Sequence, residues 1–251
     1  MQEVLAIALR SMQQDVARLE QVGTNLANVS TPGYKRQVLV SRTEHALVPS
    51  FAQAMVGVAT GPEGVAVPQS PQPFELVRDM RAGTLRATGR SLDVALAGGG
   101  YLEVQTPSGA AYTRQGELQL DARGRLVTMQ GLPVQGQAGD IQLSSSAVTI
   151  DAKGNVSDGG RVVDRLKIVA FEPGQALKPL DGGLFAEGRN PSLLSEAEVD
   201  VRQGFLENSN VQQAHEMVEL MQTMRRFESM QRIVQGYDDL VGSAIRKLGD
   251  A

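Results

Sequence analysis

The 251-residue sequence predicts an α+β protein with a helix at each end and an antiparallel β-domain between them. Three observations support this fold class. Apolar residues recur at steps of mostly three and four near both ends, which is the period of an amphipathic helix. Short apolar segments separated by turns that contain Asp and Gly fill the middle, as expected for a β-meander. Six prolines interrupt residues 30–80, which rules out a continuous helix or a central strand there.

The first helix is expected over residues 1–30. Its apolar residues form an a/d-like seam over more than three heptads, and such a stripe needs a partner surface. The seam consists of Leu5, Leu9, Met12, Val16, Leu19 and Leu26. The helix is expected to end before Pro32-Gly33, because proline disfavours helical backbone in the residue before it and Pro-Gly is a strong turn signal.

Residues 31–83 are expected to form an extended arm, and residues 84–190 the β-domain. Within the β-domain, Asp121-Ala-Arg-Gly124 and Asp151-Ala-Lys-Gly154 repeat one turn pattern. The Asp side chain accepts hydrogen bonds from its own backbone, and Gly tolerates positive φ. A meander of such short strands predicts a small sandwich or a partly open barrel.

Residues 191–251 are expected to form a connector and the second helix. Ser209 and Gln212 fit a capping box, which predicts a helix start at that point. The stripe of this helix contains several adaptable methionines, a residue type that suits packing against non-identical partners. Its predicted interface residues are Met217, Leu220, Met224, Phe227, Val234, Val241 and Ile245.

Composition argues against several functions. A net charge of −4 and 4% aromatic residues, with no Trp, argue against nucleic-acid binding. The absence of Cys excludes disulfides and thiolate ligands. "LAGGGYLEV" lacks the spacing of a phosphate-binding loop, and His45 and His215 stand apart from any second ligand. We therefore expect no catalytic residues, no metal, no cofactor and no small-molecule substrate.

The sequence shows neither a signal peptide nor an apolar run of about 20 residues. Three function classes then compete. A structural polymer subunit needs two exposed end stripes and a loose arm. An enzyme, such as a glycan hydrolase at the cell wall, needs a cleft with carboxylates in the β-domain. A coiled-coil adaptor needs helices that associate independently of the β-domain. The pattern favours the polymer subunit.

Four stretches resemble the bacterial flagellar rod and hook proteins, in the order expected for that family. They are "NLANVSTPGYKR", "GRSLDVALAGGGYLEVQT", "AYTRQGELQLDARGRLVTMQGLPVQG" and "VRQGFLENSNVQQAHEMVELMQTMRRFE". The resemblance implies a structural subunit of the flagellum. Its terminal helices would form a coiled-coil layer inside a tube, with the β-domain outside. Asn25 and Asn28 would then either bond neighbouring subunits or cap the first helix.

The resemblance also implies partners and a location. The partners would be other rod subunits, proximal and distal, together with the flagellar export apparatus. The chain would leave the cytoplasm by type III export and join the basal-body rod that spans the periplasm. The chain has no room for the extra domain of a hook protein. "RRFE" at 225–228 and the Pro-rich stretch at 60–73 favour the proximal type of rod protein, with the distal type as the alternative.

Overall fold

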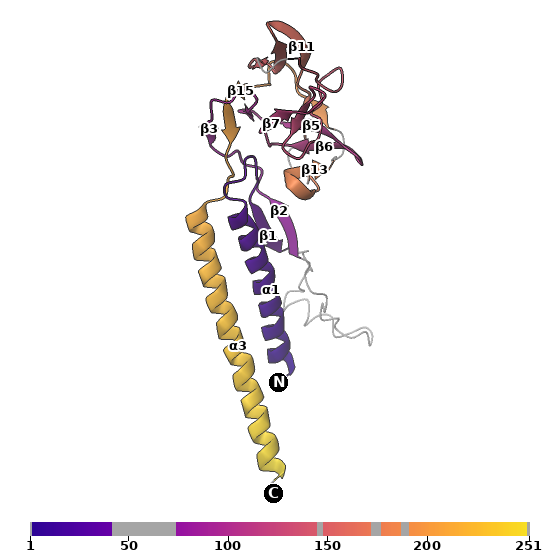
Figure 1. Ribbon diagram of the computed structural model, residues 1–251. Coiled ribbons are helices and arrows are strands. Elements are labelled where there is room, and N and C mark those ends of the chain that lie inside the picture. Colours follow the sequence, from indigo (N-terminus) through magenta and orange to yellow (C-terminus); the bar gives the residue numbers. More distant parts are fainter. Residues whose placement is uncertain (1, 42–73, 145–147, 172–176, 187–190, 250–251) are drawn as a thin grey trace, which may run out of the picture.

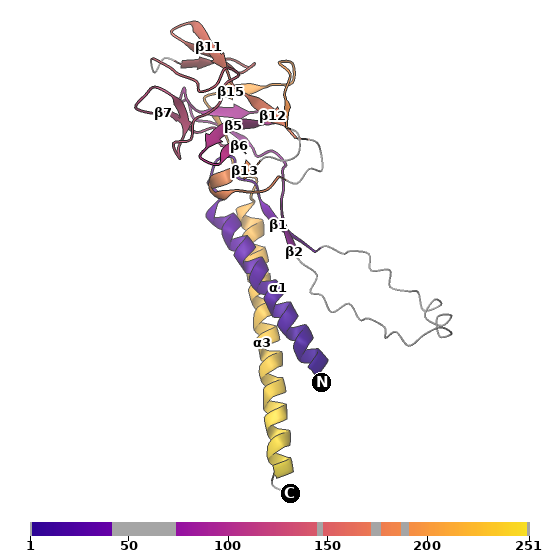
Figure 2. The same ribbon diagram turned by 90° about the vertical axis from the view of Figure 1, so that its right-hand side faces the viewer.

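The computed structural model describes residues 2–41, 74–144, 148–171, 177–186 and 191–249. The molecule is elongated, with two long helices at one end and a β-rich head at the other (Figure 1). Helix α1 spans Gln2–Ala27 and helix α3 spans Gln213–Gly249. They run antiparallel and side by side, and α3 extends beyond the N-terminal end of α1 (Figures 1 and 2). The α+β class is confirmed.

The seam between the two helices differs from the predicted one. On α1, the buried residues of the seam are Ala8, Asp15, Val22 and Asn25. Leu9 and Val16, assigned to the seam from the sequence, are 48% and 42% exposed. Met12, Leu19 and Leu26 are half-buried, and the side chain of Leu5 lies outside the described part of the structure.

On α3, too, the buried residues differ from those of the predicted apolar stripe. Glu216 and Thr223 are buried, whereas Met217 and Met224 are 47% and 49% exposed. Leu220, Phe227 and Val234 are half-buried, and the side chains of Val241 and Ile245 lie outside the described residues. These four exposed side chains do not pack between the helices of one subunit, and their assignment to an assembly interface stays a prediction.

Helix α3 also begins later than predicted. Ser209 is not its cap; the Ser209 Oγ accepts a hydrogen bond from the Val211 N–H at 3.2 Å, and the helix starts at Gln213. The Asn210 side chain donates to the carbonyls of Asp79 and Arg81, which holds this part of the chain extended. Tertiary hydrogen bonds thus overrule a local capping signal.

Two strands within the expected arm pair with each other. Strand β1 (Gln37–Ser41) pairs antiparallel with β2 (Phe74–Arg78), and β1 lies against α1. The residues between the two strands, 42–73, lie outside the described part of the chain, and so does the whole Pro-rich stretch at 60–73.

The head contains several small antiparallel sheets. The largest has the order β13-β6-β5-β12-β14, a second has the order β11-β10-β9, and three further pairs are β15-β4, β16-β3 and β7-β8. The strands are β3 (Leu85–Ala87), β4 (Val94–Leu96), β5 (Tyr101–Thr106), β6 (Gly109–Thr113), β7 (Leu118–Leu120), β8 (Leu126–Thr128), β9 (Val148–Ile150), β10 (Asn155–Asp158), β11 (Arg161–Arg165), β12 (Ile168–Ala170), β13 (Leu184–Ala186), β14 (Ser192–Leu193), β15 (Val201–Gln203) and β16 (Phe205–Glu207). A 3-10 turn covers Asp181–Gly183.

Both Asp-x-x-Gly turns are confirmed. The Asp121 carboxylate accepts hydrogen bonds from the N–H groups of Arg123 and Arg125, both at 2.8 Å. Asp151 accepts the equivalent bonds from Lys153 and Asn155, both at 2.9 Å. Gly124 and Gly154 have φ of 74° and 83°, where glycine has no steric penalty.

The core of the head is aliphatic, with one aromatic cluster at the large sheet. Valines, leucines and isoleucines from most of the small sheets meet in a single buried group. Beside it, Tyr101 packs edge-on against Phe171 and Phe185 at centroid distances of 5.5 and 5.6 Å. The interlocked sheets therefore bury apolar area that no single pair of strands buries alone.

A narrow two-stranded ribbon joins the head to the helices. The chain enters the head through β3 and β4 and returns through β15 and β16, which pair with them. Residues 191–207, expected as a connector, thus supply three strands to sheets whose other strands lie in 84–190. The N–H groups of Thr88 and Gly89 both donate to the carbonyl of Gly204, which links the two halves of the ribbon.

Candidate functional site: a buried polar joint between helices and head

The "NLANVSTPGYKR" segment lies where the helices meet the head. The chain leaves α1 and turns at Gly33, whose φ is 69° and whose N–H donates to the Glu207 carbonyl at 2.8 Å. A Cβ at this position would lie 2.6 Å from the backbone carbon of Arg114. Only glycine fits this turn, because the backbone conformation and the lack of space both exclude a side chain.

Lys35, directly after this turn, forms a buried ion pair. Its Nζ lies 2.6 Å from Glu207 Oε1, and both side chains are 1% exposed. The other oxygen of Glu207 accepts from Arg114 Nη1 at 3.3 Å, and Oε1 also accepts from the Gly83 N–H at 2.8 Å. Lys35 further donates to the Arg81 carbonyl at 2.9 Å. Burial lowers the pKa of Lys35, while its hydrogen bond to Glu207 acts in the opposite direction.

The Glu207 carboxylate therefore connects four parts of the chain. Lys35 follows α1, Gly83 precedes β3, and Glu207 itself ends β16 on the way to α3. Arg114 follows β6 in the head, where its guanidinium also donates to the carbonyls of Leu96 and Gly98. A buried charge is tolerable only with such partners, so this carboxylate ties the head to both helical connections.

A second cluster lies one turn further into the helices. Asn25 is fully buried, and its Oδ1 accepts from the Gln37 N–H at 2.8 Å and from the Tyr34 hydroxyl at 3.2 Å. Its Nδ2 donates to the Gln37 carbonyl at 2.9 Å and to Glu216 Oε2 at 3.1 Å. Arg36 Nε donates to the other oxygen of Glu216 at 2.5 Å. This cluster fixes α1, β1 and α3 against one another.

Asn25 and Asn28 play different parts. All four bonds of Asn25 stay within the chain, and none of them is a bond to a carbonyl of the last helical turn. Asn28 behaves as a residue of the helix end: its Nδ2 donates to the Thr24 carbonyl at 2.9 Å, and its Oδ1 accepts from the Thr31 hydroxyl. Within the subunit, Asn28 thus takes the local role at the helix end, and its contact with a neighbouring subunit stays a prediction.

On the side of strands β1 and β2, the joint is bordered by two aromatic rings. The guanidinium carbon of Arg78 lies 5.4 Å from the ring centre of Tyr34 and 5.5 Å from that of Phe185, which permits cation–π attraction. Burial raises the pKa of the Tyr34 hydroxyl and lowers the pKa of Arg78. The β1–β2 pair is in this way attached to the head as well as to α1.

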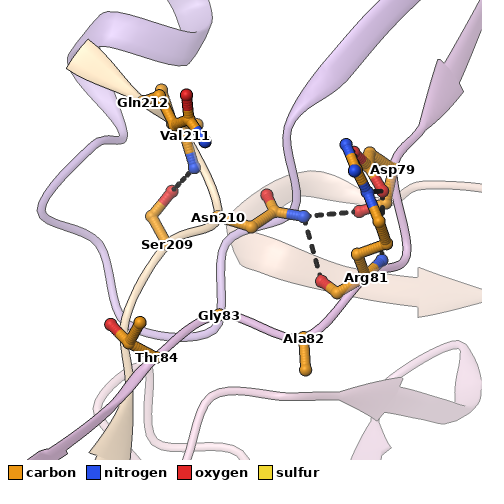
Figure 3. Close-up of a pocket in the computed structure, with 9 residues that line it drawn as sticks. All are labelled: Asp79, Arg81, Ala82, Gly83, Thr84, Ser209, Asn210, Val211 and Gln212. Atoms are coloured by element: carbon orange, nitrogen blue, oxygen red, sulfur yellow. Dashed lines mark hydrogen bonds and ion pairs between the residues drawn. The ribbon is translucent and has the colours of Figure 1, made fainter. Parts of the chain in front are cut away.

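An open cleft adjoins the joint where the two connecting segments pass each other (Figure 3). Asn210 points across it, and its side chain reaches the carbonyls of Asp79 and Arg81. The Asn210 Oδ1 accepts from the Arg36 N–H at 2.7 Å. The Asn210 amide therefore helps to hold the two connecting segments together, a structural role that the sequence did not indicate.

Sequence reasoning missed most of this joint. Lys35, Arg114, Glu207 and Glu216 were not among the predicted interface residues. The signal was present in "TPGYKR" and "GFLENSN", where charged residues stand next to glycine and apolar residues, but nothing local reveals that these segments meet. Among the described residues, no group of three His, Asp or Glu side chains has a geometry that suits a metal ion, and no helix is long and apolar enough to cross a membrane.

Large apolar side chains remain exposed on both helices. On α3, Met217, Val218, Met221, Met224, Ile233 and Leu240 are each at least 47% exposed. Leu9 and Val16 are exposed on α1. Extended apolar surface on a helix of a folded chain marks an interaction site. A buried joint, a compact head and exposed apolar side chains on both helices are the features expected of a subunit of a larger assembly.

Comparisons with known proteins identify the kind of assembly. The domain family described as "Flagellar hook protein FlgE/F/G D1 domain" matches residues 95–158, and "Flagellar basal body rod FlgEFG protein C-terminal" matches residues 202–247. The flagellar basal-body rod protein FlgF of Escherichia coli is 33% identical over 97% of both chains. FlgF of Salmonella typhimurium is 32% identical over 97% of both chains. FlgG of Bacillus subtilis is 29% identical over 93% of this chain and 94% of its own. The chain belongs to the flagellar basal-body rod proteins and is FlgF-like.

Proposed function

We propose that this protein polymerises through the exposed faces of α1 and α3, so that the terminal helices form an inner coiled-coil layer with the heads outside. The chain is a structural subunit of the flagellar basal-body rod, the axial drive shaft that transmits motor torque to hook and filament. The observation that carries the proposal is the buried joint. It fixes the head to the helices while leaving apolar helix faces exposed.

The joint gives a physical reason for torque transmission. Torque passes through a subunit only if its inner and outer parts do not rotate freely about their connection. A two-stranded ribbon alone is a weak connection, since an isolated strand pair is only marginally stable. The buried Glu207 and Glu216 clusters add ionic contacts that cannot slide without exposing an unpaired charge.

The finer details are parts of the same proposal. The layers proposed for the rod are an inner helix (1–30), an arm (31–83), a head (84–190) and a connector with the second helix (191–251), with the connector contributing strands β14, β15 and β16 to the head. The proximal position is supported by the FlgF relatives, and the distal position of FlgG is the second candidate. Type III export, contact with the export apparatus and a path across the periplasm follow from rod membership. A structural role also makes an enzymatic one unnecessary.

Replacement of exposed methionines tests polymerisation through the helices. Met217, Met221 and Met224 lie on one face of α3 and are 47%, 52% and 49% exposed. Changing all three to Gln is expected to alter the unfolding free energy of the monomer by less than about 0.5 kcal/mol per site. Swimming, hooks and filaments are expected to be lost. Met129→Gln, at a 54% exposed head position, is the matched control and should swim normally. Wild-type swimming of the triple variant would refute assembly through this face.

A further inference from the structure

A cleft between the two helices has an excess of cationic side chains. Arg18 of α1 forms one wall of this cleft, and residues of α3 form the other. It is lined by Arg18, His215, Val218, Glu219, Gln222 and Arg226. This cleft is separate from the cleft of Figure 3, which lies between the connecting segments, and it borders the joint through Glu219, which bonds Arg36.

The two arginines of this cleft are only partly engaged. Arg18 Nε lies 3.9 Å from Glu219 Oε1, and Arg226 Nε lies 3.7 Å from Asp15 Oδ1, both beyond hydrogen-bond distance. Their side chains are 37% and 51% exposed. Glu219, the only acidic residue in the lining, already bonds Arg36 at 3.2 Å. Each guanidinium has five N–H donors, so several remain available to an incoming acceptor.

The exposed face of α1 carries a complementary pattern. Leu9, Gln13, Val16 and Glu20 follow steps of four, three and four, which places them on one side of the helix, and all four are exposed. Within the described residues, Glu20 has no ion-pair partner. The stripe thus presents one carboxylate next to apolar side chains. The cleft presents guanidinium groups next to Val218, with the exposed Met221 beside it on α3.

We propose that the cleft of one subunit receives Glu20 from α1 of a second copy of this chain, with Val16 of that copy packing on Val218. Arginine recognises carboxylates with paired donors, and a partly shielded pair of this kind fixes register more than it adds affinity. The two surfaces differ and lie on one molecule. The contact is therefore heterologous and can repeat head-to-tail from subunit to subunit. The inference rests on the proposed rod function and specifies one lateral contact within it.

Cysteine cross-linking tests the contact without background, because the chain has no cysteine. Thr24→Cys is one turn from Glu20 on the same face and leaves the carboxylate in place, and Gln222→Cys is in the cleft wall. Each substitution is placed in a separate, differently tagged chain, and both chains are expressed together. A short bis-maleimide applied to isolated basal bodies is expected to give a dimer containing both tags. Gln231→Cys, on the opposite face of α3, replaces Gln222→Cys in the control and is expected to give none.

Charge reversal provides the second measurement. Glu20→Lys is expected to cause loss of swimming while the melting temperature of the purified monomer stays unchanged, since Glu20 is exposed. Glu20→Gln is expected to have a smaller effect. Basal bodies that contain both tagged chains but yield no mixed dimer would overturn the contact and leave the rod function intact. So would normal swimming of Glu20→Lys. Absence of the chain from basal bodies would instead overturn the rod function itself.

Discussion

Lys35 Nζ lies 2.6 Å from Glu207 Oε1, with both side chains 1% exposed, although 172 residues separate them in the sequence. This pair joins the segment after α1 to the segment before α3. Arg114, which belongs to the head, forms an ion pair with the same Glu207 carboxylate. The relative orientation of helices and head therefore depends on one buried charge cluster, and its energetics can be measured.

Glu207→Gln is expected to be strongly destabilising, because it leaves Lys35 and Arg114 buried without a counter-charge. Breaking a buried pair in this way costs about 3–5 kcal/mol. Urea unfolding of the purified protein measures the change. Glu196→Gln removes the exposed partner of Lys153 and is the control, with an expected cost below about 1 kcal/mol. Equal stability of the two variants would contradict the role given to Glu207.

Asn25→Asp is expected to destabilise the protein more than Asn25→Ala does. The aspartate would place a second carboxylate beside Glu216 Oε2, which now accepts from the Asn25 amide at 3.1 Å. The alanine instead leaves buried groups unsatisfied, at about 1–3 kcal/mol each. Asn28→Ala, with partners only at the helix end, is the control and should cost least. Thermal unfolding of the three variants gives the order, and a more stable Asp variant would disprove the arrangement.

Gly33→Ala is expected to prevent normal formation of the joint, since its Cβ would lie 2.6 Å from the Arg114 backbone at a φ of 69°. Gly23→Ala is the matched control. Gly23 is exposed within α1, and a methyl group there would have no atom within 4 Å apart from the neighbouring helix backbone. That control is expected to stabilise the protein by about 0.5–1 kcal/mol, in line with helix propensity. Melting temperatures of the two variants, measured by circular dichroism, are expected to shift in opposite directions. Shifts of the same sign would contradict this prediction.

The turn at Asp121 is expected to weaken at low pH. Hydrogen bonds, first from the Arg125 N–H, lower the pKa of the Asp121 carboxyl below its ordinary value. A lowered folded-state pKa means that this contribution is fully present above the unfolded value, about 3.9, and is lost as pH falls through the folded value. The stability difference between wild type and Asp121→Asn should therefore shrink below about pH 4. Urea unfolding of both proteins at neutral pH and in acid measures this stability difference. A difference that does not change with pH would refute the prediction.

Protection of α3 against hydrogen exchange is expected to fall along the helix in the monomer. Glu216 and Thr223 are buried against α1, whereas Ile233 and Leu240 are 49% and 71% exposed. Gly236 adds an unfavourable helix residue in the exposed half. Amides beyond Gly236 should therefore exchange fastest, and assembly into rods should slow them. Uniform protection in a proven monomer would contradict this expectation.

Local features of this protein were predictable from its sequence. Helix α1 ends near Pro32-Gly33, and the Asp121 and Asp151 turns form as predicted, because each rests on the backbone preferences of neighbouring residues. The apolar period identified both terminal helices. The α+β class follows from these elements, since strands with period two and helices with period 3.6 have different patterns along the chain.

The tertiary structure alone decided which faces of those elements meet. Asn25 bonds Glu216 across 191 residues of sequence, and both side chains are buried, whereas Leu9, Val16, Met217 and Met224 are exposed. The apolar pattern showed that stripes exist but not which partner each one takes. The physical reason is that a buried carboxylate without its donors costs more than an exposed Leu or Met. Asn25 and Glu216 are therefore paired within the subunit, whereas apolar side chains on both helices are exposed, and we propose that neighbouring subunits cover them.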